Sequence, residues 1–210
     1  MKTDDLIAVL AADTLPQATV AQRMMRSLPL AIGVSLMLFV LFWGLRPDLT
    51  AALTSPVAGK TLVPSGLVIV AGALAFALSH PGQRWQRRFW LTGLFIALLV
   101  AGFALALARD GLTGLAAALG TPALLTCLAS IPALALPLLA AVLWALSAGA
   151  ALQPRLTGAA GGLMAGGLAA AIYSLYCDQD AALFSLPAYS AAILMVALAG
   201  GLAGPRLLKW

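Results

Sequence analysis

Six long segments of this 210-residue chain contain no Asp, Lys or Arg, and Glu is absent throughout. A helix needs about 20 apolar residues to cross a hydrocarbon core roughly 30 Å thick, and each segment is long enough for one crossing. The segments are rich in Leu and Ala without polar alternation, which favours helices over the strands of a membrane β-barrel. The uncharged segments are Leu28–Leu45, Thr61–Ser79, Phe89–Ala108, Gly111–Pro154, Leu156–Cys177 and Ala181–Pro205.

Composition excludes a soluble fold. Apolar residues make up 62% of the chain and charged residues only 9%, whereas a soluble domain carries about 25% charged residues. We therefore expect an all-α integral membrane protein in which a tail, residues 1–27, precedes a membrane domain, residues 28–210. The six transmembrane helices are expected at about 28–45, 61–79, 89–108, 127–152, 156–176 and 186–205.

The distribution of basic residues predicts the orientation, because Lys and Arg are retained on the cytoplasmic side of a membrane. With six spans and both termini cytoplasmic, nine basic residues lie inside and three outside. The outside residues are Arg46, Lys60 and Arg109. This bias predicts a multi-pass protein of the bacterial inner membrane.

The segment Gly111–Pro154 is long enough for two spans. Dividing it at Ser130 would leave six basic residues on each side and remove the bias, so one span at about 127–152 is favoured. The preceding residues, Leu112–Thr126, are interrupted by glycine and proline. We expect them to form a helix that lies on, or dips into, the outer face.

Small residues recur at every fourth position of the fifth span, in Gly158, Gly162 and Gly166. This spacing places them on one helix face, where they allow another backbone to approach closely. The partner is either a helix of the same chain, which is the commoner arrangement, or a second copy in a homodimer.

The sequence lacks the residues that catalysis and ion transport usually require. The expected spans contain no ionisable residue of the kind that marks ion pathways, and the single histidine, His80, cannot supply the paired ligands of a membrane haem. Hydroxyls such as Ser35, Ser147 and Ser174 are expected to bond to their own helix backbones. We therefore expect no enzyme and no cofactor.

Two cysteines are the best chemical candidates. Cys127 begins the fourth expected span and Cys177 ends the fifth, so both lie at the outer face. Three interpretations remain open: a redox- or metal-responsive pair, a permanent disulfide, or two inert packing residues. A metal site is conceivable from the two thiolates with Asp178 and Asp180 nearby, but a four-ligand zinc site is not available.

The tail predicts a short amphipathic helix. Thr3 can cap a helix whose first turn holds Asp4 and Asp5. Apolar residues, including Leu6, Ile7 and Leu10, then follow at helical spacing. The acidic flanks disfavour anionic lipid, so a protein partner is the expected binding target. Farther on, Thr19 and Gln22 match a capping box that begins another helix.

Both ends of the chain resemble one bacterial family. The motifs are Met1-Lys2-Thr3-Asp4-Asp5-Leu6-Ile7 with Ala11-Ala12-Asp13, Tyr173-x-x-Tyr176-Cys177, and the closing Gly204-Pro205-Arg206-Leu207-Leu208-Lys209-Trp210. Together they resemble the NrsF family, the negative regulators of sigma-F of proteobacteria, over the full length of the chain.

The resemblance implies an inner-membrane anti-sigma factor. Such a protein holds an extracytoplasmic-function (ECF) sigma factor inactive at the cytoplasmic face and frees it on stress, with no nucleic-acid contact of its own. The resemblance also implies that Cys127 and Cys177 sense heavy-metal or oxidative stress. It assigns the sigma contacts to the tail and to a basic loop, through Thr3, Asp4, Asp5, Leu6, Ile7, Leu10, Arg84, Arg87 and Arg88.

Two other functions remain open. A small transporter or channel subunit would need a polar path, and the spans offer only scattered Ser, Thr and Tyr. A membrane thiol oxidoreductase would use Cys127 and Cys177 as an exchanging pair, although such enzymes usually carry a Cys-x-x-Cys motif.

Overall fold

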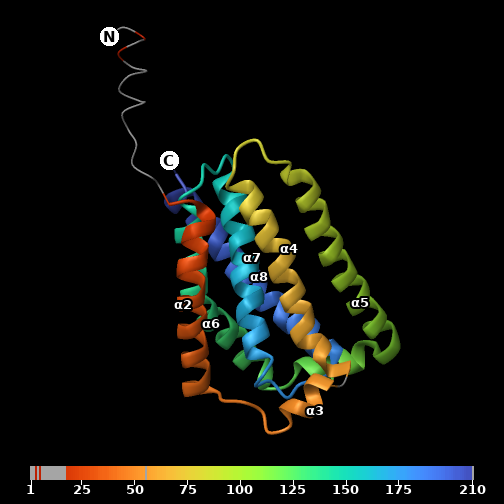
Figure 1. The fold of residues 1–210 in the computed structure, drawn as a ribbon. Coiled ribbons are helices and arrows are strands. Elements are labelled where there is room, and N and C mark those ends of the chain that lie inside the picture. The colour runs from red at the N-terminus through yellow and green to blue at the C-terminus, as the bar shows by residue number, and fades with distance from the viewer. Residues whose placement is uncertain (1–2, 4, 6–17, 55, 210) are drawn as a thin grey trace.

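The computed structural model describes residues 3, 5, 18–54 and 56–209, and these form a bundle of helices without a strand (Figure 1). Among the described residues, six helices are long and apolar enough to cross a membrane. The expected all-α fold with six long helices is thus confirmed. These helices are α2 (Val20–Phe42), α4 (Gly59–Leu78), α5 (Trp85–Leu119), α6 (Ala123–Leu146), α7 (Pro154–Tyr173) and α8 (Ala182–Leu207).

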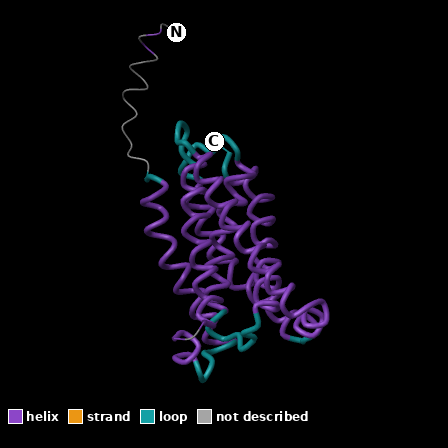
Figure 2. The backbone as a smooth tube through the Cα atoms, turned by 90° about the vertical axis from the view of Figure 1, so that its right-hand side faces the viewer, coloured by secondary structure: helices purple, strands orange, loops and turns teal. Residues whose placement is uncertain are grey.

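The bundle has two distinct ends, at which the loops gather (Figure 2). The start of α2, the connectors 79–84 and 147–153, and the end of α8 at Leu207 lie at one end, which we call the tail end (Figure 1). The connectors 43–58, 120–122 and 174–181 lie at the other, which we call the cysteine end. The connector 43–58 includes the short helix α3 (Leu49–Thr54) and a 3-10 turn, Pro56–Ala58.

Helix α2 begins earlier than the uncharged segment suggests. The Thr19 hydroxyl accepts a hydrogen bond from the Gln22 amide at 3.2 Å, and the Gln22 side chain accepts one from the Thr19 amide at 3.0 Å. This is the capping box that the sequence indicates, and it starts α2 at Val20. The first turns of α2 therefore contain Arg23 and Arg26, which lie outside the uncharged segment.

A break at Gly111 separates two parts of α5. Gly111 has φ 69° and ψ 179°, a conformation that glycine adopts without the steric cost of a side chain. The residues after it, Leu112–Leu119, form the expected additional helix at the cysteine end (Figure 1). This helix ends before Thr126, because Gly120, Thr121 and Pro122 form a turn and α6 begins at Ala123. Only one long helix, α6, lies between Gly111 and Pro154.

The glycine ladder packs inside the chain. Helix α7 lies at the centre of the bundle and its glycine face meets α8. A β-carbon on Gly158 would lie 2.2 Å from the Gly200 carbonyl oxygen, and one on Gly162 would lie 2.6 Å from the Ala197 α-carbon. Gly166 faces Ile193 at 3.2 Å. The two backbones therefore approach as closely as small-residue interfaces allow.

Replacing Gly158 with Ala should separate α7 from α8, because the new methyl group would meet backbone atoms that cannot rotate away. Overpacking of this kind costs about 1–3 kcal/mol and occasionally more. We expect a lower melting temperature for purified G158A, measured by circular dichroism. Gly102→Ala is the matched control, because nothing lies within 4 Å of its β-carbon position. Equal melting temperatures for the two variants would contradict this packing.

Candidate sensor site at the cysteine end

Cys127 and Cys177 are brought together in the interior of the cysteine end. Cys127 lies in the second turn of α6, and Cys177 lies in the connector beyond the end of α7 at Tyr173. The side chains are 0% and 3% exposed, and both thiols are free. The two thiols are direct neighbours. The sequence placed Cys177 at the end of the fifth span, whereas α7 ends four residues earlier, at Tyr173.

Aromatic rings enclose the two thiols. The Cys127 thiol lies 3.6 Å from the Tyr173 hydroxyl oxygen. The Tyr173 ring packs edge-on against Trp43, with centroids 6.4 Å apart, and against Tyr189, with centroids 6.2 Å apart. We call Cys127, Cys177, Tyr173 and Tyr189 the dithiol cluster. Because its members come from α6, α7, α8 and the 174–181 connector, chemistry at the thiols acts on several helices at once.

A buried arginine ties the Cys177 connector to the end of α2. The Arg46 side chain is 7% exposed, and its guanidinium pairs with Asp48 at 2.6 Å and with Asp180 at 3.0 Å. It also donates to the Cys177 carbonyl oxygen at 3.3 Å. The Lys60 ammonium contacts Asp180 and the same carbonyl oxygen. We call Arg46, Asp48, Lys60 and Asp180 the Arg46 network.

The Arg46 network changes the interpretation of the two acids near Cys177. Asp180 is held by Arg46 and Lys60, whereas Asp178 is exposed and accepts a hydrogen bond from the Gln179 side chain at 3.4 Å. Within the described ranges, no group of three His, Cys, Asp or Glu side chains is placed to hold a metal. Soft-metal binding here would therefore depend on the two sulfurs.

The same surroundings shift the pKa values of Cys177 and Asp180, which both lie in the 174–181 connector. The neighbouring Cys127 thiol, the Gln179 amide and the nearby Lys60 charge lower the pKa of Cys177, although burial opposes this. The lower pKa favours the thiolate, which is the reactive form. The Arg46 hydrogen bond, followed by Lys60, lowers the pKa of Asp180. The stabilisation from Asp180 is thus present above about pH 4, the ordinary Asp value, and is lost only as the pH falls through the lowered one.

Replacing Asp180 with Ala should loosen the connector and expose Cys177. The variant loses charged hydrogen bonds worth about 1.5–3 kcal/mol each when buried, discounted because the Asp180 side chain is 34% exposed. A net loss of about 1.4 kcal/mol corresponds to a tenfold change. We therefore expect about tenfold faster alkylation of Cys177 by N-ethylmaleimide, followed by peptide mass spectrometry. Asp178→Ala is the matched control, because it also removes a carboxylate near Cys177, but from an exposed residue. Equal alkylation rates in the two variants would contradict the anchoring role of Asp180.

The other residues proposed for partner binding lie at the tail end or before it. Arg84 precedes α5 and is exposed, as is Arg87, whereas Arg88 is half-buried and donates to the Ala73 carbonyl oxygen at 3.0 Å. Thr3 and Asp5 are helical and exposed. The remaining tail residues named above, Asp4, Leu6, Ile7 and Leu10, lie outside the described residues.

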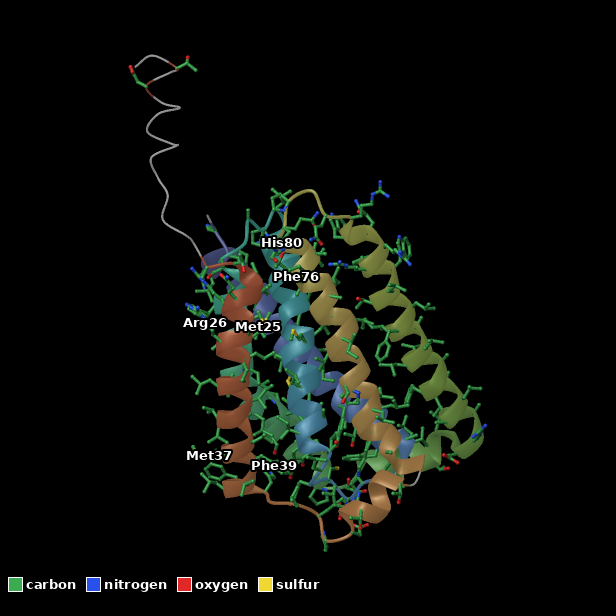
Figure 3. All side chains as sticks on the ribbon, in the orientation of Figure 1. Met25, Arg26, Met37, Phe39, Phe76 and His80 are labelled. Carbon is green, nitrogen blue, oxygen red and sulfur yellow. The ribbon has the colours of Figure 1, made fainter. Side chains whose placement is uncertain are left out.

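Two further features of the tail end are visible in Figure 3. Met25 and Arg26 lie on the outer side of α2, and both are exposed. The His80 Nδ1 lies 2.8 Å from the Phe76 carbonyl oxygen, and its ring packs on Phe76. His80 is therefore held by the end of its own helix, as expected for a residue of a turn.

Polar contacts connect α2, which follows the tail, to α6, which carries Cys127. Ser35 donates to the Leu134 carbonyl oxygen at 3.0 Å and Ser27 to that of Ala141 at 3.3 Å. Arg23 donates to the Ser147 hydroxyl at 3.3 Å and lies over the Trp144 ring. The expectation that Ser35 bonds to its own helix was wrong, because its buried hydroxyl donates to a carbonyl of α6 instead. Ser147 and Ser174 do bond to their own helices, at 2.7 Å each.

Comparison with known proteins gives a match over nearly the whole chain. A family model described as "Negative regulator of sigma F" (NrsF) matches residues 10–210. The "Anti-sigma-F factor NrsF" of Caulobacter vibrioides is 38% identical over 215 aligned residues, with 100% of both chains covered. The "Probable anti-sigma-F factor NrsF" of Azospira oryzae is 31% identical over 244 aligned residues, also with 100% of both covered. No solved structure matches.

Proposed function

The chain belongs to the NrsF family, and from this membership we propose that it is a membrane anti-sigma factor. It captures a sigma factor of the ECF class at its tail end, in the cytoplasm, and releases the sigma factor when the dithiol cluster is oxidised or binds a soft metal at the opposite face. The observation that carries the proposal is the full-length similarity to a protein named an anti-sigma-F factor. The role is regulatory rather than enzymatic.

The arrangement of the helices supports a protein that senses on one side of the membrane and binds the sigma factor on the other. The start of α2, the arginines 84 and 87 and the C-terminus share one end of the bundle, whereas the thiols share the other (Figure 1). Six helices of membrane-spanning length and composition separate these ends. Under the positive-inside rule, the end richer in basic residues faces the cytoplasm of the inner membrane. The tail end is therefore on the side where a sigma factor is found.

The trigger we propose is closure of the thiol pair. An oxidant of the peroxide class takes two electrons and two protons from Cys127 and Cys177, and a sulfur–sulfur bond forms. This bond requires a sulfur separation of about 2.05 Å, so the start of α6 and the 174–181 connector are drawn together. A soft cation such as Cu(I) would instead be held between the two sulfurs.

The change is expected to reach the tail through α6 and α2. Helix α6 carries Cys127 and lies against α2 through Ser35, Ser27 and Arg23. A small shift of α6 changes these contacts, and α2 begins directly after the tail. Coupling between two such sites is typically about 1–3 kcal/mol, which is a 5–150-fold change in affinity. This range is sufficient for a switch between capture and release.

Deletion of the gene tests the anti-sigma role. We expect transcripts from the promoters of the captured sigma factor to rise without any stress, and a plasmid copy of the wild-type chain to restore repression. In the same cells, green fluorescent protein fused after Trp210 should fluoresce, because the proposed C-terminus is cytoplasmic. Unchanged transcripts would contradict the anti-sigma role, and a dark fusion that is stably expressed would contradict the orientation.

A further inference from the structure

Two adjoining cavities lie between α4, α5 and α8. The first has a volume of about 250 Å³ and the second of about 240 Å³. They share five lining residues, which come from all three helices: Leu67, Leu99, Leu186, Ser190 and Ile193. The cavities therefore follow one another between the same helices, and the first adjoins the dithiol cluster through Tyr189.

The polarity of the lining changes from the first cavity to the second. Lys60, Asp180 and Ser185 line the first cavity, near the cysteine end. The second cavity is lined by apolar side chains such as Ile96, Val100, Phe103 and Leu194, with Ser190 as its polar residue. Small-molecule sites in proteins are commonly concave and apolar, with a few polar groups that fix the orientation of the ligand. Here the polar groups are at one end, which suits an elongated ligand with one polar head.

Tyr189 provides a donor without a partner in the first cavity. Its side chain is 4% exposed and lines that cavity. The hydroxyl is buried and makes no hydrogen bond with any described residue. A buried polar group left unpaired costs about 1–3 kcal/mol. A ligand atom that accepts a hydrogen bond would remove this cost.

The depth of the cavities along α4 fits one leaflet of a bilayer. On α4 the lining extends from Gly59 to Leu67, and at 1.5 Å per residue this is a rise of about 12 Å. Half of a hydrocarbon core is about 15 Å. We propose that the two cavities bind a single acyl chain, with its carbonyl-bearing head at Tyr189 and Lys60 and its tail against Val100 and Leu194. Free fatty acids and the ester-linked chains of phospholipids share this chemistry.

Photo-crosslinking in lipid nanodiscs tests the site. The wild-type chain is incubated with palmitic acid carrying a diazirine, or with a phosphatidylethanolamine carrying the same chain, then irradiated and mapped by peptide mass spectrometry. We expect saturable adducts on the cavity faces of α4, α5 and α8. Competition by unlabelled palmitic acid would identify a free fatty acid as the ligand, and competition by unlabelled phospholipid alone would identify a membrane lipid.

Three variants distinguish the site from general contact with lipid. Leu99→Trp fills the wall shared by both cavities and should reduce saturable labelling at least tenfold. Tyr189→Phe keeps the shape and removes one hydrogen bond worth about 0.5–1.5 kcal/mol, so a loss of about 2–12-fold is expected. Leu198→Trp is the control, because Leu198 lies on α8, 67% exposed and outside both cavities.

Labelling of the wild type that does not saturate, or that is spread over the exposed faces of all six helices, would overturn the proposal. Equal saturable labelling of the Leu99→Trp and Leu198→Trp variants would also overturn it. Undiminished labelling of Tyr189→Phe would refute the proposed head position. These results do not depend on sigma capture, so the site and the anti-sigma role fail or stand separately.

Discussion

Replacing Leu6 and Ile7 together with Asp is expected to abolish capture of the sigma factor while the six-helix bundle still inserts into the membrane. The two side chains belong to the apolar face predicted for the tail, and burying each in a partner contributes about 1.5–3 kcal/mol. The loss of both corresponds to at least a 100-fold weaker complex, since each 1.4 kcal/mol is tenfold. Pull-down of the tagged variant, with membrane fractionation, measures both outcomes.

The tail also offers a matched control. In the helix that the sequence predicts for the tail, with 3.6 residues per turn, Ala8 and Ala12 would lie on the opposite face from Leu6 and Ile7. Ala8→Asp with Ala12→Asp adds the same charge to the same segment and is expected to leave capture nearly unchanged. If both double variants lose the sigma factor equally, charge rather than the apolar face is responsible. If neither loses it, the tail is not the principal contact.

The second large effect is expected when Cys127 and Cys177 are both replaced with Ser. The variant should capture the sigma factor normally, because neither thiol lies at the tail end, but it should no longer release it when an oxidant is added. Oxidant-induced transcription from the target promoters should fall to the uninduced level. The wild type is expected to show an induction within the 5–150-fold range of site-to-site coupling.

Single variants separate the possible roles of the thiols. A disulfide needs both sulfurs, so Cys127→Ser alone and Cys177→Ser alone should each remove oxidant induction as completely as the double change. Full induction in the double variant would exclude the dithiol cluster as the trigger. A double variant that releases the sigma factor without any oxidant would indicate that the pair is a permanent structural bond in the cell.

Much of the fold could be predicted from local sequence. The uncharged segments define the number of long helices, because length and composition alone decide whether a helix suits a membrane. The capping box at Thr19 and the ladder of Gly158, Gly162 and Gly166 were also predictable. Each involves residues three or four positions apart, and such residues lie on one face of a helix. Helix ends were less predictable, since the extended helices include Arg23 and Lys60 at positions that the uncharged segments exclude.

The candidate site was only partly predictable, because it depends on residues distant in sequence. The two cysteines were identifiable as the only thiols, but Arg46 pairs with Asp180 across 134 positions, and no local pattern marks that contact. A charge signal did exist. Only three basic residues were expected on the outer side of the membrane, and Arg46 and Lys60 are two of them. Their proximity to the acids beside Cys177 could have been proposed on charge alone. The unpaired hydroxyl of Tyr189 required the three-dimensional structure.

Co-purification with and without an oxidant tests whether the chain holds a sigma factor and releases it on oxidation. The tagged chain is isolated in mild detergent from membranes of its own bacterium, with and without a thiol oxidant, and the co-purifying proteins are identified by mass spectrometry. We expect an ECF sigma factor that is bound at rest and absent after oxidation. Isolation of the protein without any sigma factor under either condition would contradict the anti-sigma role.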